Sequence, residues 1–271
     1  MKNIMTVDLE EWYHQNLTDS GNHTTVLTAR VEQNTEKLLH IFNDAKVTAT
    51  FFCLGETAQK HPGLIRKIHE AGHEIASHGF RHELVYRQNR KEFFENVKKS
   101  KDILSDISGR EIKGFRSPSW SITENSLWAL EVISELGFIY DSSIFPMKNF
   151  LYGIPDSPQF CYEHTIGEKT LLEVPPSTFS FLGKRMGFSG GFYFRAFPLF
   201  FTIHTAKSLN KQSNPVVFYI HPHEIDMEHP RENRSLRDRL ILYYGIERCE
   251  KKLIKTFKEI SCVSIEQYYN L

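Results

Sequence analysis

The chain has 271 residues, 40% of them hydrophobic, which is enough for one large domain with a sizeable core. Lysine plus arginine equals aspartate plus glutamate at 33 each, so no basic excess is available to hold a polyanion, and we expect no nucleic-acid partner. The four cysteines are scattered without a C-x-x-C pair, which excludes zinc-finger and redox motifs and favours reduced thiols.

Short apolar runs alternate with helical periodicity along the whole chain. The predicted elements are strand 4–7, helix 30–44, strand 47–52, helix 56–71, strand 74–77, helix 91–107, strand 113–116, helix 124–136, strand 138–140, strand 171–174 after a long loop, helix 195–209, strand 216–220 and helix 235–259. This alternation is typical of parallel β-α units that close a barrel or form a doubly wound sheet.

Targeting and membrane signals are not found in the sequence. The first predicted strand, 4–7, leaves no room for a signal peptide, so we expect a cytoplasmic protein. No run approaches the ~18 apolar residues of a membrane span, so we expect no transmembrane segment. The oligomeric state cannot be read from the sequence.

Polar side chains follow five of the predicted strands at the point where each strand ends. They are Asp8, Glu10 and Glu11 after the first strand, His78 and His82 after the third, Arg116, Ser119 and Trp120 after the fourth, Asp141 after the fifth, and His221 and His223 after the last. In a parallel β/α barrel the carboxyl ends of the strands carry the chemistry. We therefore expect these side chains to form one active site.

A metal site is predicted from the spacing of two histidines. His78 and His82 are four positions apart and can bind one metal ion, and a carboxylate from the first strand would complete a two-histidine, one-carboxylate set. Such a set leaves a position for water, whose pKa a metal lowers to about 7. Along a strand Asp8 and Glu10 share a face, whereas Glu11 points the other way, so Glu10 is favoured over Glu11.

The remaining polar residues have the chemistry of hydrolysis. His221 can deliver a proton to a leaving group, and a carboxylate that does not bind metal can accept one from water. Arg116 beside an acid would lower the pKa of that acid and hold its orientation. Asp141 is expected to orient His221 and favour its protonated form.

At this point the chain resembles the polysaccharide deacetylases of carbohydrate esterase family four, the group with the NodB homology domain. The resemblance rests on five motifs in order: Thr6-Val7-Asp8-Leu9-Glu10, His78-Gly79-Phe80-Arg81-His82, Arg116-Ser117-Pro118-Ser119-Trp120, Asp141, and Tyr219-Ile220-His221. Four further motifs of the chain resemble those of the family branch found in exopolysaccharide-biosynthesis loci. They are Val7 to Trp12, Tyr140 to Pro146, Gly190 to Arg195, and His221 to Glu224.

The resemblance implies an irregular (β/α)7 barrel, like a TIM barrel, with residues 1–271 as one catalytic domain and 225–271 as its helical extension. It implies removal of N-acetyl groups from amino-sugar residues of an exopolysaccharide or its precursor, with a carbohydrate as the partner. The implied metal, most simply Zn²⁺, is held by Glu10, His78 and His82. The implied base is Asp8, the implied acid is His221, Arg116 and Asp141 support them, and Ser119 and Trp120 contact substrate.

The sequence departs from the family pattern at three places. Leu9 replaces the second aspartate of the early motif, which makes Glu10 the nearest substitute ligand. Ser119 stands where an aromatic residue is usual, with Trp120 next. His223 is an alternative acid to His221. His14 could reach the cleft, although a loop residue without a role is favoured.

Two other functions remain as alternatives, and one aromatic stretch has two interpretations. An allantoinase- or imidase-like hydrolase of cyclic amides would keep the fold, and a non-catalytic carbohydrate-binding protein would keep only the cleft. The aromatic stretch 188–203 is interpreted as barrel packing and a helix start, with peripheral contact to a lipid-linked glycan as its alternative.

Overall fold

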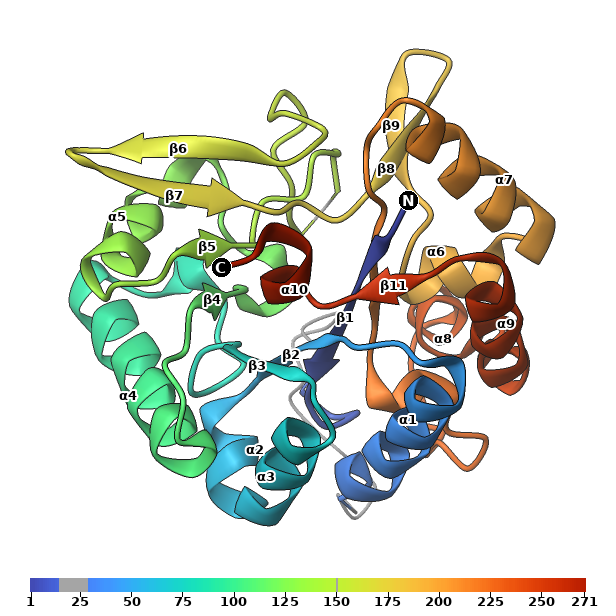
Figure 1. Ribbon diagram of the computed structural model, residues 1–271, viewed down its shortest axis with the longest axis horizontal. Coiled ribbons are helices and arrows are strands. Elements are labelled where there is room, and N and C mark those ends of the chain that lie inside the picture. The colour runs from blue at the N-terminus through green and yellow to red at the C-terminus, as the bar shows by residue number, and fades with distance from the viewer. Residues whose placement is uncertain (15–28, 150) are drawn as a thin grey trace.

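The computed structural model describes residues 1–14, 29–149 and 151–271 of the chain. Within these ranges a nine-stranded sheet has the order β10-β1-β2-β3-β4-β5-β7-β6, and β11 pairs with the start of β1. All its pairs are parallel except the β6–β7 hairpin. The sheet curls, and helices α1 to α5 lie outside it (Figure 1). The predicted α/β class is confirmed.

The elements have the following bounds. The strands are β1 (Asn3–Leu9), β2 (Thr50–Cys53), β3 (Glu74–Ser77), β4 (Gly114–Phe115), β5 (Tyr140–Asp141), β6 (Tyr162–Ile166), β7 (Lys169–Glu173), β8 (Thr178–Phe181), β9 (Lys184–Gly187), β10 (Val217–Ile220) and β11 (Cys262–Val263). The helices are α1 (Val31–Ala45), α2 (Gly55–Lys60), α3 (Pro62–Glu70), α4 (Arg90–Ser108), α5 (Trp128–Glu135), α6 (Gly191–Ala196), α7 (Leu199–Lys211), α8 (Leu236–Tyr243), α9 (Ile246–Glu259) and α10 (Ile265–Tyr269).

Strand β1 pairs with three other strands, β2, β10 and β11. Every one of its residues is buried, as expected for a parallel strand that is covered on both faces. It pairs with β2 on one side and with β10 on the other, so Val7 lies between Phe51 and Ile220. Because these strands run in the same direction, the residues that follow them reach the same rim of the sheet.

The sheet forms a curled half-barrel and is not closed by a continuous ladder. The path ends at β10 on one side and at β6 on the other. Ser177, which follows β7, bonds to β10 across the seam between the two ends of this path. Its Oγ accepts the backbone N–H of Val217 at 2.9 Å, and its own N–H donates to the Val217 carbonyl at 3.4 Å. Gly190 adds an isolated parallel bridge to Tyr219, where a Cβ would meet the tyrosine ring at 2.2 Å.

The predicted long loop before the sixth strand contains more structure than the sequence indicated. The β6–β7 hairpin extends the sheet, and β8–β9 form a second, two-stranded sheet. Residues in β6 alternate between half-buried and exposed, as do those of many edge strands, so their apolar signal is weak. In the stretch 188–203, Phe188 and Phe194 are buried, which fits barrel packing, whereas Phe200 is exposed.

Three predicted helices are each divided in two, which corrects their expected bounds. Helix 56–71 is α2 and α3, because Pro62 lacks an N–H and restricts the backbone of His61. Helix 195–209 is α6 and α7, with Pro198 before the second. Helix 235–259 is α8 and α9, separated at Gly245, whose φ of 76° is left-handed.

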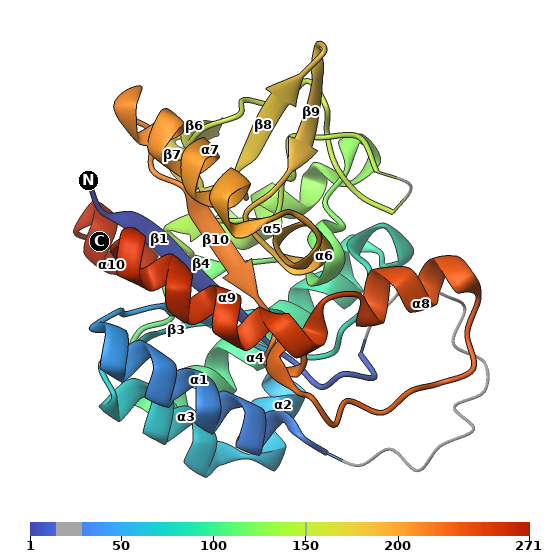
Figure 2. The same cartoon turned by 90° about the vertical axis from the view of Figure 1, so that its right-hand side faces the viewer.

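The last part of the chain packs onto the same sheet. Helix α9 lies against α1 and α7, and β11 adds to β1, while α8 projects beside the rim where the strands end (Figure 2). In the three ranges described, no helix is both long and apolar enough to cross a membrane.

The contact between Gly114 and Tyr140 provides a test of the sheet. These residues are paired in the β4–β5 register, and a Cβ on Gly114 would meet the Tyr140 ring at 1.9 Å. We expect Gly114→Ala to lower the free energy of unfolding by about 1–3 kcal/mol, measured by urea denaturation. The control is Gly63→Ala in α3, where a Cβ meets nothing within 4 Å. An equal loss in both variants would contradict this packing.

Candidate active site

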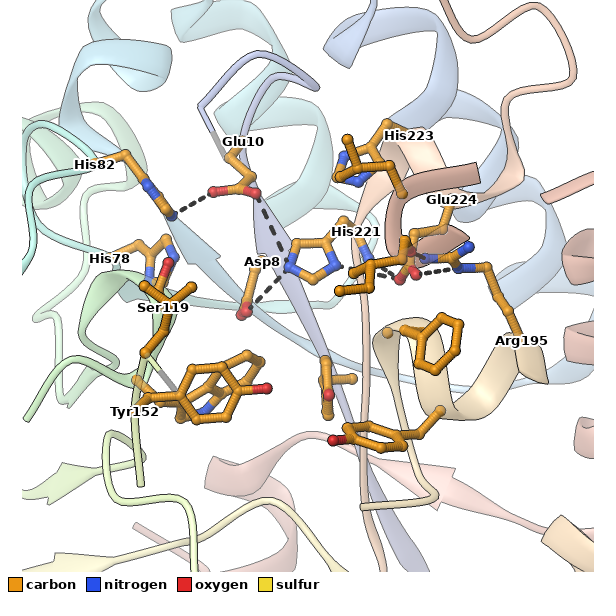
Figure 3. Close-up of a pocket in the computed structure, with 18 residues that line it drawn as sticks. Asp8, Glu10, His78, His82, Ser119, Tyr152, Arg195, His221, His223 and Glu224 are labelled. Atoms are coloured by element: carbon orange, nitrogen blue, oxygen red, sulfur yellow. Dashed lines mark hydrogen bonds and ion pairs between the residues drawn. The ribbon is translucent and has the colours of Figure 1, made fainter. Parts of the chain in front are cut away.

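Three predicted ligands come together where β1 and β3 end. Glu10, His78 and His82 each offer one ligand atom, and these atoms all lie within 4.8 Å of one another. Glu10 follows β1 directly, and both histidines lie in the loop after β3, on the same rim (Figure 3). The arrangement is a candidate metal site with two imidazole nitrogens and one carboxylate.

His78 is oriented to bind a cation through one ring nitrogen. His78 Nδ1 lies 2.7 Å from the carbonyl oxygen of Arg116, so the proton is on Nδ1 and Nε2 is left as the donor atom. Burial lowers the pKa of His78 to about 4, so its imidazole is neutral at pH 7. Burial opposes the charge on Glu10, but His82 and the other nearby histidines hold its pKa well below the usual range.

The carboxylate of Glu10 is incompletely paired. Its Oε2 lies 2.7 Å from His82 Nε2, yet it accepts no aligned hydrogen bond from any group that the structure describes. The residue is only 3% exposed, so water does not compensate freely. A buried carboxylate oxygen of this kind, next to two histidine side chains, fits a divalent cation.

Asp8 lies beside the ligands and is held by Arg116. Its Oδ1 accepts from Arg116 Nη1 at 2.6 Å, and the two side chains are 2% and 0% exposed. The same Nη1 donates to Thr6 Oγ1, and Nη2 donates to Ser142 Oγ at 2.9 Å. Oδ1 of Asp8 is therefore fixed by Arg116. The other carboxylate oxygen, Oδ2, lies 3.7 Å from His221 Nε2.

His221 follows β10 and faces both carboxylates of β1. Its Nε2 lies 3.7 Å from Asp8 and 3.9 Å from Glu10, and its Nδ1 lies 3.2 Å from Glu224 Oε2. Burial disfavours the imidazolium, but the hydrogen bond and charge of Glu224, with Glu10 and Asp8, raise the pKa of His221 to about 9. The ring is therefore oriented and protonated at neutral pH.

Arg195 forms an ion pair with Glu224, the carboxylate that contacts His221. Arg195 Nε donates to Glu224 Oε1 at 2.7 Å, and Glu224 Oε2 also accepts the backbone N–H of His221 at 3.0 Å. Burial raises the pKa of Glu224, but Arg195 and His221 lower it further, to well below the usual range. Both residues lie in motifs noted in the sequence, but only the fold shows that they meet each other and His221.

The expected contact between Asp141 and His221 is wrong. Asp141 is fully buried and accepts from Ser143 Oγ at 2.6 Å, and its carboxyl group pairs with that of Glu173. Burial raises the pKa of Asp141 to about 6 and that of Glu173 much further, so Glu173 holds the proton they share. The carboxylate that contacts His221 is instead Glu224, three residues further along the same loop.

The alternatives left by the sequence have distinct positions. The carboxylate of Glu11 accepts the backbone N–H groups of Arg30 and Val31 at the start of α1, away from the ligand cluster. His223 lines the cavity with its ring stacked 5.2 Å from that of His221. The ring of His14 stacks on that of His82, with 6.3 Å between ring centroids, so His14 lies beside the ligand cluster.

The cavity beside these groups has a volume of about 140 Å³. Ser119 and Trp120, the residues predicted to contact substrate, line it. The backbones of both lie in the left-handed region, with φ of 52° and 48°. Such backbone is strained for residues other than glycine, and strain of this kind gathers at functional sites. Tyr152 and Tyr193, which the sequence analysis did not select, also line it.

Comparisons with known proteins divide the chain in two. Residues 12–139 match the family model described as Polysaccharide deacetylase, and residues 142–270 match one described as Domain of unknown function (DUF3473). The peptidoglycan-N-acetylglucosamine deacetylase of Bacillus cereus is 37% identical over 98 residues, 36% of each chain. The chain therefore spans about a third of the length of that curated relative.

Solved structures resemble the whole chain. A polysaccharide-deacetylase-like protein of Mycobacterium smegmatis has a TM-score of 0.63 at 20% identity, covering 100% of this chain and 90% of its own. PuuE allantoinase has a TM-score of 0.62 at 17% identity, covering 95% and 85%. At these identities the likeness concerns the fold, which confirms the barrel-like α/β architecture predicted for a single domain.

The candidate metal site is tested by a pair of neighbouring glutamates. We expect Glu10→Gln to lower the zinc content of the protein after loading and dialysis by at least about tenfold, because the site loses its anionic ligand. Glu11→Gln should retain the metal, since that carboxylate binds the start of α1. Metal content is measured by plasma mass spectrometry. Retention in the first variant would reject Glu10 as a ligand, and loss only in the second would make Glu11 the ligand.

The contact between Glu224 and His221 is tested by titration of the metal-free protein. We expect Glu224→Gln to lower the pKa of His221 from about 9, because the largest factor favouring its charge is removed. The stabilisation from this raised pKa is complete below the unfolded value of about 6.5 and is lost as pH rises through about 9. NMR of the imidazole measures the pKa, with the exposed Glu228→Gln as control. An unchanged pKa would rule out this contact.

Proposed function

We propose that the chain is a metal-dependent hydrolase that removes N-acetyl groups from amino sugars, because residues 12–139 match the model of the polysaccharide deacetylase family. The observation that carries this proposal is the arrangement of a carboxylate, a protonated histidine and a candidate metal site around one cavity. Asp8, His221 and the cluster of Glu10, His78 and His82 all line that cavity (Figure 3).

Each residue has a part in amide hydrolysis. Glu10, His78 and His82 would hold a divalent cation, which supplies Lewis-acid polarisation of a carbonyl and lowers the pKa of water. Asp8 takes the proton from the attacking water, with its carboxylate kept in place by Arg116. His221 gives its proton to the departing amine nitrogen, and Glu224 keeps the ring oriented for that transfer.

The finer points of the proposal are the metal, the substrate and the location. Zinc suits a site of two imidazoles and one carboxylate. The motifs shared with the exopolysaccharide-locus branch support an exopolysaccharide or its precursor as the source of the N-acetyl sugar. Trp120 and Ser119 in the cavity wall are proposed to contact the sugar, and a cytoplasmic location remains a prediction.

The two alternative functions make different predictions for the same assay. A cyclic-amide hydrolase would open allantoin or a cyclic imide without releasing acetate, and a carbohydrate-binding protein would bind sugar without any hydrolysis. The paired Asp8 and His221 favour hydrolysis over binding alone, because a binding site has no need of a buried base and acid.

The proposed base is tested by Asp8→Asn. We expect this variant to lose acetate release from N-acetylated saccharides by at least about a hundredfold, since general base catalysis contributes about 10²–10⁴-fold. Its zinc content should be nearly unchanged, because Asp8 is outside the ligand cluster. Acetate is measured by a coupled enzymatic assay and metal by plasma mass spectrometry.

The control is Asp44→Asn, at an exposed position near the end of α1. Asp44→Asn should keep both activity and metal. Full acetate release by Asp8→Asn would reject Asp8 as the base, and ring opening of allantoin by the wild type, without acetate from any saccharide, would replace the proposed function by the cyclic-amide alternative.

A further inference from the structure

The hairpin of β8 and β9 projects from the body of the molecule. Among the residues described, these two strands form a small sheet of their own. Both views show the hairpin extending beyond the neighbouring helices, with its turn at the far end (Figure 1, Figure 2). Its base is held by packing, because the ring of Phe179 lies 5.9 Å from that of Phe197 and 5.1 Å from that of Phe201, between centroids.

The turn of this hairpin presents large apolar side chains to solvent. Phe181 is 59% exposed and Leu182 is 87% exposed, the highest value for a large hydrophobic side chain in the described part of the chain. Single exposed apolar residues are common on protein surfaces, so exposure alone does not indicate a partner. The backbone of the turn supplies the second observation.

Leu182 occupies a position that disfavours leucine. Phe181 pairs with Lys184, so Leu182 and Gly183 are the two central residues of the turn. Their φ angles are 49° and 75°, both left-handed, as in a type I′ turn. Asparagine, aspartate or glycine is usual at the first of these positions, because other side chains are strained there. Leucine therefore costs stability here while it buries little within the fold, which fits a contact outside the chain.

The segment that carries the hairpin lacks negative charge. Residues 174–223 contain no aspartate or glutamate and five lysines and arginines, although the whole chain is neutral with 33 acidic residues. Arg185 donates to the backbone carbonyls on either side of Asp156, at the base of the hairpin. The exposed Lys184 is therefore the cation that the turn presents to solvent.

An apolar turn with a cation beside it has the chemistry of a contact with an anionic bilayer. Aromatic and aliphatic side chains enter the boundary between headgroups and acyl chains, and basic side chains bind anionic headgroups. A protein partner would need a hollow that matches the projecting turn, because protein interfaces depend on complementary shape. A fluid lipid surface accepts a projecting turn without such a hollow.

A second exposed apolar face lies on α8, where Leu236 is 84% exposed and Leu240 is 53% exposed. This face differs from the hairpin in two respects. Acidic residues, among them Glu232 and Asp238, lie between its basic ones in the sequence, and its backbone is an ordinary helix. It therefore provides a matched comparison for the hairpin.

The base of the hairpin adjoins the active site. Strand β9 ends at Gly187, where a Cβ would meet the ring of Tyr193 at 2.9 Å, and Tyr193 lines the cavity. The four residues of β9 span about 14 Å between this contact and the turn. A chain docked through the turn would keep its cavity near the bilayer surface.

We propose that the turn of the β8–β9 hairpin, Phe181 to Lys184, docks the chain on the surface of an anionic lipid bilayer. Phe181 and Leu182 enter the interface, and Lys184 binds an anionic headgroup. This docking is independent of the deacetylase function proposed above, because none of these residues belongs to the candidate active site.

Binding of the full chain to vesicles is measured by flotation in a density gradient. One set of vesicles contains phosphatidylcholine alone, and the other contains equal parts of phosphatidylcholine and phosphatidylglycerol. We expect the wild type to float with the anionic vesicles much more than with the neutral ones, and less as salt is added, because salt screens the contact of Lys184. No binding to the anionic vesicles, or equal binding to both sets, would overturn the proposal.

Leu182→Asn separates docking from folding. Asparagine suits the left-handed position, so the variant should unfold at the same urea concentration as the wild type or a higher one. Its binding to anionic vesicles should fall by at least about tenfold, because the apolar contact is lost. Binding equal to that of the wild type would overturn the proposal, and so would a loss of binding together with a lower urea midpoint, which would make Leu182 a structural residue.

The matched control is Leu236→Gln on α8, which removes an apolar side chain of similar exposure. It should bind anionic vesicles as the wild type does, whereas Lys184→Gln should bind more weakly and with a smaller dependence on salt. A loss in Leu236→Gln as large as that in Leu182→Asn would overturn the assignment of docking to the hairpin.

Discussion

The ion pair between Arg116 and Asp8 lies at the centre of the fold, and both its members are removed from water. A buried charge is tolerated only where its partners are complete, because the desolvation of each ion costs several kcal/mol. Arg116 meets this condition with Asp8, Thr6 and Ser142, and its guanidinium lies 4.1 Å from the centre of the Phe52 ring. Residues from β1, β2 and the loop after β5 are thereby fixed around one cation.

The same residue connects structure to chemistry through its backbone. Arg116 receives a hydrogen bond from His78 at its carbonyl oxygen and gives one from its N–H to Ser77. Its side chain fixes Asp8 while its main chain fixes the tautomer of a candidate metal ligand. A substitution of Arg116 would therefore disturb both Asp8, the proposed base, and His78, a candidate metal ligand, although these two residues are far apart in the sequence.

Most of the candidate site could be predicted because each residue directly follows a predicted strand. Asp8, His78, Arg116 and His221 were found in this way, and strand alternation separated Glu10 from Glu11. The link from Arg195 to Glu224 could not be predicted, since it depends on how α6 and the loop after β10 pack across the seam. Asp141 was assigned to His221 because the sequence gives the end of a strand but not which neighbours a side chain meets inside the curled sheet, where Asp141 meets Ser143 and Glu173.

The position of β1 has a consequence for how the chain reaches its native state. This strand is made first, yet one of its edges pairs with residues 217–220 and the start of its other edge pairs with residues 262–263, which are made late. Contacts so distant along the chain slow folding, because a long loop must close before they form. Until then β1 has an open edge that other strands can pair with, so the emerging chain is most prone to aggregation before its final fifth is synthesised.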